Sequence, residues 1–208
     1  LMTHVTLKAD PFNLIVTGVG GQGNVMTSRA VGNMLSQLGL HVTIGETFGA
    51  SQRGGSVMSH LRISAKSSWS PQIPLDQAHM IVSMEPTETL RVLKDYGHPG
   101  VTVITNTRPF YPVGVISGQL NYPKDEEIRA WISELSARAF FLNATEKAVE
   151  IGNPVLGNVI MAGALAGTGE LPLSREIFQA IMSTRFKDDK LRMNMEAFDW
   201  GVANVQAV

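Results

Sequence analysis

The stretch that most constrains the fold is FNLIVTGVGGQG, residues Phe12 to Gly23. An apolar run ends in Gly18, Gly20, Gly21 and Gly23, and an amphipathic pattern begins directly afterwards. This order predicts a strand, a tight turn and a helix, with the turn spelled G-x-G-x-x-G. Glycines in such a turn let the backbone approach a ligand closely, and the N-terminus of the helix offers unpaired N–H groups to an anion.

The glycine pattern by itself is compatible with several kinds of protein. A nucleoside triphosphatase would need Lys followed by Ser or Thr, and this chain has Asn24 and Val25 there, which disfavours that class. A dinucleotide site needs an acidic residue roughly 20 positions further on, at the end of the second strand. Glu46 is close to that position. A turn that serves packing alone is a third interpretation.

The composition of the chain limits the classes of protein to which it can belong. A chain of 208 residues, 44% of them hydrophobic, is long enough for one domain with a sizeable core. The net charge is −1 and no Lys/Arg cluster is present, so nothing indicates a nucleic-acid or anionic-membrane surface. No apolar run reaches the roughly 20 residues that a membrane span needs. The first ten residues lack the apolar core of a signal peptide, so we expect a cytoplasmic location.

The sequence contains no cysteine. It therefore offers no disulfide, no thiol nucleophile and no thiolate ligands for zinc or for an iron–sulfur cluster. The five histidines are scattered, without an H-E-x-x-H motif or an i, i+4 pair, so we expect no metal site. No constellation of catalytic residues is recognisable, and we assign none.

A second glycine-rich stretch, TFGASQRGG, occupies residues 47–55 and should form a loop after the second strand. In open α/β sheets ligands bind at the carboxyl ends of strands, so this loop and the first turn can face one crevice. Arg53 then either clamps a phosphate, a carboxylate or a neighbouring subunit, or lies in solvent. The candidate contact residues for a cofactor or partner are Gly18, Gly20, Gly21, Gln22, Gly23, Glu46, Arg53, Gly54 and Gly55.

The remaining pattern predicts an α/β fold with a Rossmann-like, mostly parallel sheet flanked by helices, and a helical C-terminal third. We expect a single domain over residues 1–208, with an α/β core at 12–143 and helices at 144–208. Residues 56–63 alternate in polarity and predict a half-exposed strand, with an antiparallel edge strand as one option. Residues 107–122 are apolar but rich in Pro and Gly, which predicts an extended arm or hairpin that lies on another surface, either of this chain or of a second chain.

Two helices have informative patterns. In the helix expected after the glycine turn, Met26, Ala30, Met34 and Leu38 recur every four residues and should form the apolar stripe. Val31 and Leu35 widen this stripe. The segment 156–165 is apolar nearly all round, so it should be buried on most sides.

Several motifs together carry a resemblance to a known family. GVGGQG, GETFGASQRGGSV, SMEPTETLR, TNTRPFYP, GNPVLGNV and the closing MEAFDWG resemble the gamma-type subunits of 2-oxoacid:ferredoxin oxidoreductases, in particular those of the indolepyruvate type. The resemblance covers essentially Asn13 to Gly201.

The resemblance implies a non-catalytic subunit of an enzyme that converts a 2-oxo acid and coenzyme A to acyl-CoA, carbon dioxide and reduced ferredoxin. Thiamine diphosphate, Mg²⁺ and iron–sulfur clusters would belong to a catalytic partner subunit, in agreement with the missing cysteines. We therefore expect a hetero-oligomer with the catalytic subunit, which reduces ferredoxin, and a homodimer as the alternative when the chain is isolated. We expect no nucleic acid and no membrane as partner. The alternative is a free-standing Rossmann-like protein that binds NAD(P), another nucleotide or coenzyme A.

Overall fold

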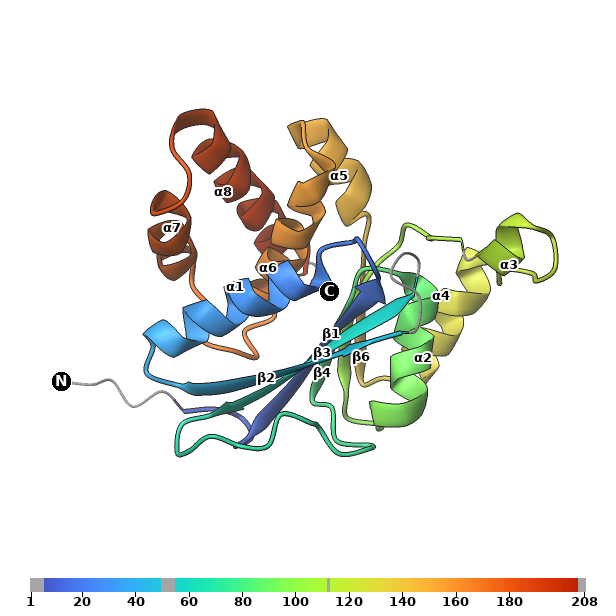
Figure 1. The fold of residues 1–208 in the computed structure, drawn as a ribbon, viewed down its shortest axis with the longest axis horizontal. Helices are drawn as coiled ribbons and strands as arrows, with labels where there is room; N and C mark the ends of the chain where they lie inside the picture. The colour runs from blue at the N-terminus through green and yellow to red at the C-terminus, as the bar shows by residue number, and fades with distance from the viewer. Residues whose placement is uncertain (1–5, 50–54, 112, 206–208) are drawn as a thin grey trace.

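The computed structural model describes residues 6–49, 55–111 and 113–205, which form a six-stranded sheet with helices on both faces (Figure 1). The strands are β1 Phe12–Val19, β2 His41–Phe48, β3 Ser56–Ser64, β4 Met80–Ser83, β5 Thr102–Asn106 and β6 Arg138–Leu142, in the order β2-β3-β1-β4-β5-β6. The helices are α1 Asn24–Gln37, α2 Pro86–Tyr96, α3 Val113–Ile116, α4 Asp125–Glu134, α5 Ala144–Ile151, the 3-10 helix η1 Pro154–Leu156, α6 Gly157–Gly167, α7 Arg175–Ser183 and α8 Asp188–Ala203.

The sheet is mostly parallel, which confirms the predicted fold class. β1, β4, β5 and β6 pair in parallel, whereas β3 pairs antiparallel with both β1 and β2. The strand that follows α1 is therefore not the neighbour of β1, because β3 is inserted between them. This insertion determines where the side chains of β2 lie relative to the glycine turn.

The prediction of a half-exposed strand at 56–63 was wrong about exposure and about the suggested edge position, and right about the antiparallel direction. β3 is antiparallel, but β2 forms the edge, and the polar side chains of β3 are buried: His60 is 2% exposed and Arg62 is 8% exposed. The connection after β3 covers them. Arg62 donates from Nη1 to the Gln72 carbonyl oxygen at 3.0 Å and lies 5.2 Å from the Trp69 ring.

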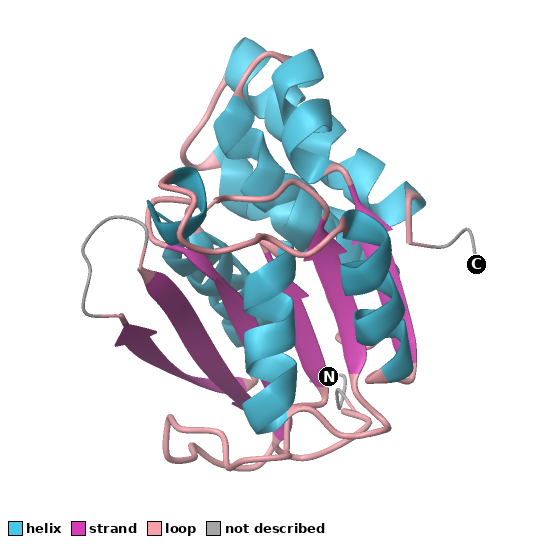
Figure 2. Cartoon of the chain, turned by 90° about the vertical axis from the view of Figure 1, so that its right-hand side faces the viewer, coloured by secondary structure: helices cyan, strands magenta, loops and turns pink. Residues whose placement is uncertain are grey.

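Strand alternation divides the core into two layers, one on each face of the sheet. Leu14 and Val16 point to the layer that contains α1 and α6, and Ile15 points to the layer under α2 and α4. Figure 2 shows helices in front of the sheet and behind it. None of the helices in the described ranges has the length and apolar character needed to cross a membrane.

Helix α6 is the centre of the C-terminal helical group, in contact with α1, α5 and α8 (Figure 1). Residues 160–165 are all buried, which confirms the prediction for this segment. α6 and α8 approach closely because glycines lie where they meet: a Cβ at Gly201 would lie 2.7 Å from the Ala164 amide nitrogen. Phe178 and Phe198 stack beside this crossing, with ring centroids 4.2 Å apart.

The buried His60 predicts an acid-sensitive fold. Burial lowers the pKa of His60 below its usual value, so the folded state keeps the ring neutral while the unfolded chain takes up a proton below about pH 6.5. The stability contribution is present above that pH and is lost as the pH falls. We expect the free energy of unfolding, measured by urea titration, to fall less for His60→Asn than for the wild type when the pH is lowered from 7.5 to 5.5. His41→Asn, at an exposed position on β2, should retain the wild-type pH dependence, and identical slopes for all three proteins would contradict the prediction.

Candidate functional site

A crevice of about 360 Å³ lies at the carboxyl ends of β1, β4 and β5, and we call it the glycine-turn crevice. Its walls include Gly21, Gln22 and Gly23 of the turn, Met84 after β4, and Asn106 and Arg108 at and after the end of β5. The remaining wall comes from α1, from the two residues after Arg108, from the start of α5, and from η1 and α6. Ligands of open α/β sheets bind at this end of the strands.

The geometry of the turn explains its glycines. Gly21 and Gly23 have φ angles of +98° and +87°, in the left-handed region that favours glycine. A Cβ at Gly23 would also collide with the Asn158 side chain of α6. The turn is closed by Gln22, whose Oε1 accepts from the Val19 amide at 2.8 Å.

The turn candidates therefore have two different roles. Gly21, Gln22 and Gly23 line the crevice, whereas Gly18 and Gly20 do not. A Cβ at Gly18 would lie 2.6 Å from Asn24 Oδ1, so Gly18 allows the first residue of α1 to pack against the strand.

The two glycine motifs meet in space. The Gly20 amide donates to the Gly55 carbonyl oxygen at 2.7 Å, which fixes the start of β3 against the glycine turn. The end of the second motif is thus brought beside the first, as the sequence predicts. Arg53 and Gly54 lie outside the described residues, so their proposed contacts stay predictions.

Glu46 is not brought to the crevice. It lies on edge strand β2, opposite Ser59 of β3, and β3 separates it from β1. Its carboxylate is 3.6 Å from the Arg29 guanidinium of α1 and takes no part in lining the glycine-turn crevice. The predicted distance along the sequence was suitable, but the inserted strand moves Glu46 away from the turn. We therefore leave Glu46 out of the site.

The crevice is suited to an anion. Within the described residues, the amide groups of Gly21 and Gly23 donate to no acceptor, and α1 adds the positive end of its dipole. None of the described residues that line the crevice is acidic. Arg108 contributes a positive charge, and its exposed side chain has no ion pair with a described residue.

Asn106 and Arg108 are site residues that the sequence analysis missed. Asn106 is buried and donates from Nδ2 to the Met84 carbonyl oxygen at 3.1 Å and to Thr145 Oγ1 at 2.9 Å, which joins three elements of the wall. Both residues occupy the carboxyl end of a predicted buried strand, and that position was the available signal.

The described lining of the crevice lacks side chains that could act as a catalytic acid or base. The described residues that line it include no His, Asp, Glu, Lys, Tyr or Ser, so no side chain there exchanges a proton near neutral pH. No group of three His, Cys, Asp or Glu residues within the described ranges is arranged to hold a metal ion. Fold and crevice together define an α/β domain with a crevice at a glycine turn whose free amide groups are suited to an anion.

The chain belongs to the pyruvate ferredoxin/flavodoxin oxidoreductase family, whose sequence profile matches residues 13–204. Indolepyruvate oxidoreductase subunit IorB of Pyrococcus horikoshii is 36% identical over 192 residues, which are 92% of this chain and 94% of that protein. The NADH-dependent phenylglyoxylate dehydrogenase subunit gamma of Aromatoleum evansii is 27% identical over 189 residues, 90% of each chain.

Solved structures share the fold. The gamma subunit of a keto/oxoacid ferredoxin oxidoreductase from Geobacter sulfurreducens matches 95% of this chain and 99% of its own, with a TM-score of 0.66 and 18% identity. The 2-oxoglutarate:ferredoxin oxidoreductase of Magnetococcus marinus matches 97% of this chain with a TM-score of 0.74 and 23% identity, and the match covers 32% of that longer chain. The chain is thus a gamma-type member of the family and an oxidoreductase subunit.

Proposed function

We propose that this chain is the non-catalytic gamma-type subunit of a cytoplasmic 2-oxoacid:ferredoxin oxidoreductase that acts on an aryl pyruvate such as indolepyruvate. Residues 1–208 would act as one domain within that enzyme. The holoenzyme would oxidatively decarboxylate the 2-oxo acid with coenzyme A to acyl-CoA, carbon dioxide and reduced ferredoxin. The observation that carries the proposal is the 36% identity to subunit IorB over 92% of the chain.

The catalytic cofactors would reside on a partner subunit. Iron–sulfur clusters need thiolate ligands, and the sequence contains no cysteine. The chain therefore has no thiolate ligands for these clusters, which supports a role as an assembly and binding subunit.

The glycine-turn crevice would hold a phosphate group of coenzyme A. Its free amide groups, the N-terminus of α1 and Arg108 are all suited to a phosphate, and no acidic side chain in the described lining opposes it. The related Magnetococcus marinus enzyme was solved with 2-oxoglutarate, coenzyme A and succinyl-CoA bound. Transfer of coenzyme A binding to this chain is our inference.

The segment 107–122 would contact the partner subunit. In the described part it is an irregular arm that contains the single turn α3, and it is not a hairpin. It exposes Phe110, Tyr111, Ile116 and Leu120, with exposed fractions from 44% to 74%. Apolar side chains gathered on one projecting segment are typical of a protein–protein contact.

A free-standing NAD(P)-binding protein is the alternative. Such a protein needs an acidic residue beside the turn to bind the ribose. The inserted strand β3 keeps Glu46 away from that position, which disfavours this alternative. NADH fluorescence that stays unchanged on titration with the protein would argue further against it.

Anaerobic purification of the tagged chain from its native cells tests the proposed function. We expect a brown complex with a large, cysteine-rich, thiamine-binding chain, and 2-oxo acid-dependent and coenzyme A-dependent reduction of ferredoxin. A colourless protein without a partner would overturn the proposal.

Arg108→Ala tests the coenzyme A contact in the assembled enzyme. Loss of one charge-assisted hydrogen bond should raise the KM for coenzyme A about tenfold or more, with kcat changed little. Arg175→Ala is the matched control, since Arg175 pairs with Asp199 on the distant α7–α8 surface and does not line the crevice. Equal KM values for both variants would show that this crevice does not bind coenzyme A.

A further inference from the structure

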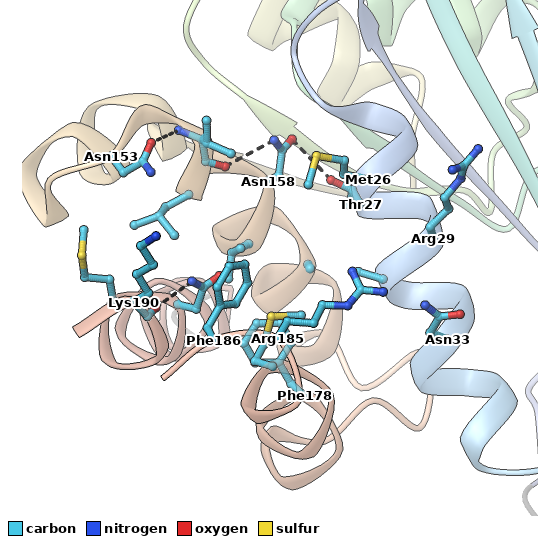
Figure 3. A pocket seen from close by; sticks show the side chains of 18 of the residues that line it. Met26, Thr27, Arg29, Asn33, Asn153, Asn158, Phe178, Arg185, Phe186 and Lys190 are labelled. Atoms are coloured by element: carbon cyan, nitrogen blue, oxygen red, sulfur yellow. Dashed lines mark hydrogen bonds between the residues drawn. The ribbon is translucent and has the colours of Figure 1, made fainter. Parts of the chain in front are cut away.

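A second and larger cavity, of about 600 Å³, lies between α1, α6, α7 and α8 (Figure 3), and we call it the interhelical cavity. Buried apolar side chains from α6, α7 and η1 form its floor, namely Leu156, Ala162, Phe178 and Met182. Its volume is in the range typical of sites for small organic molecules, and such sites are mostly apolar with few polar groups.

The mouth of the interhelical cavity is also apolar. Met26 of α1 and Val155 of η1 line it and are 63% and 57% exposed. The sequence pattern placed Met26 in the buried stripe of α1, and that prediction was wrong. Val31, Met34 and Leu35 of the predicted stripe are buried, together with Asn24, Thr27, Ser28 and Gly32. The buried face is therefore turned away from Met26 and Ala30, which line the cavity.

The charges around the interhelical cavity have one sign. Arg29, Arg185 and Lys190 line it, and none of the described lining residues is acidic, although the chain has a net charge of −1. Arg29 is engaged with Glu46, whereas the side chains of Arg185 and Lys190 pair with no other described residue. The nearest acidic residues along the chain, Asp188 and Asp189, do not line the cavity.

The two unpaired cations face the cavity from different sides. Figure 3 shows Arg185 extending from the end of α7 towards Asn33 on α1, while Lys190 extends into the cavity from α8. An apolar floor beneath unpaired cations is complementary to a molecule with an apolar body and one negative group. Because guanidinium and ammonium groups form charge-assisted hydrogen bonds, they would select an anion over a neutral molecule of the same shape.

We propose that the interhelical cavity is a binding site for a small organic anion with an apolar body, such as an aryl or aliphatic carboxylate. The cavity adjoins the glycine-turn crevice, since Met26, Val155 and Asn158 line both, but Arg185 and Lys190 line only the cavity. The proposal does not depend on the proposed subunit function. Arg185 and Lys190 bind the anionic group, and the floor around Ala162 and Phe178 binds the apolar body.

The test is calorimetric titration of the isolated full chain with 2-naphthoate, decanoate and their neutral amides. We expect at least one carboxylate to bind about tenfold more tightly than its amide, and the preferred carboxylate distinguishes an aryl ligand from an aliphatic one. Arg185→Gln combined with Lys190→Gln should abolish this preference and leave amide binding unchanged. Lys187→Gln is the matched control, since it is exposed beside α8 and does not line the cavity.

A cavity-filling variant, Ala162→Leu, should weaken both the acid and the amide, with folding checked by circular dichroism. Absence of binding for both carboxylates would overturn the proposal, as would equal affinity for acids and amides. A preference that Lys187→Gln removes as fully as the double variant would indicate unspecific charge attraction and would also overturn it. If neither carboxylate binds and the double variant instead prevents assembly with another subunit, the cavity is a protein contact.

Discussion

Gly201→Ala is expected to destabilise the protein by about 2–4 kcal/mol, because α6 and α8 cross in direct backbone contact at this position. An added Cβ would meet the Ile160 carbonyl oxygen and would lie 2.7 Å from the Ala164 amide nitrogen. These are backbone atoms of a helix that is itself buried, so no side chain can rotate away. The two helices would have to separate, and Phe178 and Phe198 beside the crossing would lose part of their packing.

The matched control is Gly157→Ala, the same substitution in the first turn of α6. A Cβ there would have its nearest neighbour at 3.8 Å, an ordinary contact, so alanine should be neutral or stabilise the helix by up to about 1 kcal/mol. Chemical denaturation of both variants measures the difference. If Gly201→Ala and Gly157→Ala have the same stability, close backbone approach does not determine this crossing.

Glu85→Ala is expected to lower the free energy of unfolding by about 3 kcal/mol and to release the arm 107–122. Glu85 is fully buried, and its carboxylate caps α2 by accepting from the Glu88 amide at 2.8 Å. Its other oxygen accepts from the Tyr122 hydroxyl and from the Phe110 amide at 3.4 Å. One carboxylate therefore fixes both ends of the arm to the core.

The test combines urea unfolding with limited proteolysis by chymotrypsin, which should cut the arm of Glu85→Ala faster than that of the wild type. Tyr122→Phe removes one of these bonds and should cost about 1–2 kcal/mol. Tyr111→Phe keeps the ring that contacts Tyr122, with ring centroids 5.0 Å apart, and should change little. Unchanged proteolysis of Glu85→Ala would show that other contacts hold the arm.

The Tyr122 bond also predicts a response to alkali. Burial, followed by the hydrogen bond to Glu85, raises the pKa of Tyr122 above its usual value of about 10. The contribution of Tyr122 to stability is therefore complete below about pH 10 and is lost as the pH rises beyond it. Stability measurements near neutral pH therefore include the full contribution of the Tyr122–Glu85 hydrogen bond.

Much of the fold could be predicted from local pattern. The apolar run before four closely spaced glycines defined β1, the turn and the start of α1, because only glycine adopts the left-handed backbone of Gly21 and Gly23 without strain. Pro86 and Ser174 begin α2 and α7 for equally local reasons, since proline suits the first helical position and the Ser174 side chain accepts from the Ile177 amide. The absence of cysteine, a property of composition alone, leaves this chain without thiolate ligands for an iron–sulfur cluster.

The candidate site could be predicted only in part. Gly21, Gln22 and Gly23 were recognised from their motif and line the crevice, whereas Gly55 contacts Gly20 of the turn without lining it. Asn106 and Arg108 were missed because a single residue at or after the end of a strand has no distinctive pattern. Glu46 has the correct spacing from the glycine turn, but its strand β2 pairs with β3 and not with β1. The number of residues between two positions does not show that a later strand is inserted between them in the sheet.

The interhelical cavity and the burial of β3 were decided by tertiary structure alone. Periodicity identified α1 as an amphipathic helix, but its apolar residues lie on two adjacent faces. Contacts with the sheet and with α6 bury one of these faces and leave Met26 exposed. The alternating β3 was buried on both faces because a later loop covers its polar side chains. The sequence determined the local conformations, because backbone sterics act between residues that are near neighbours in the chain. Which strands pair, and which distant segments bury one another, depends on the free energy of the whole packed chain, so only the tertiary structure shows it.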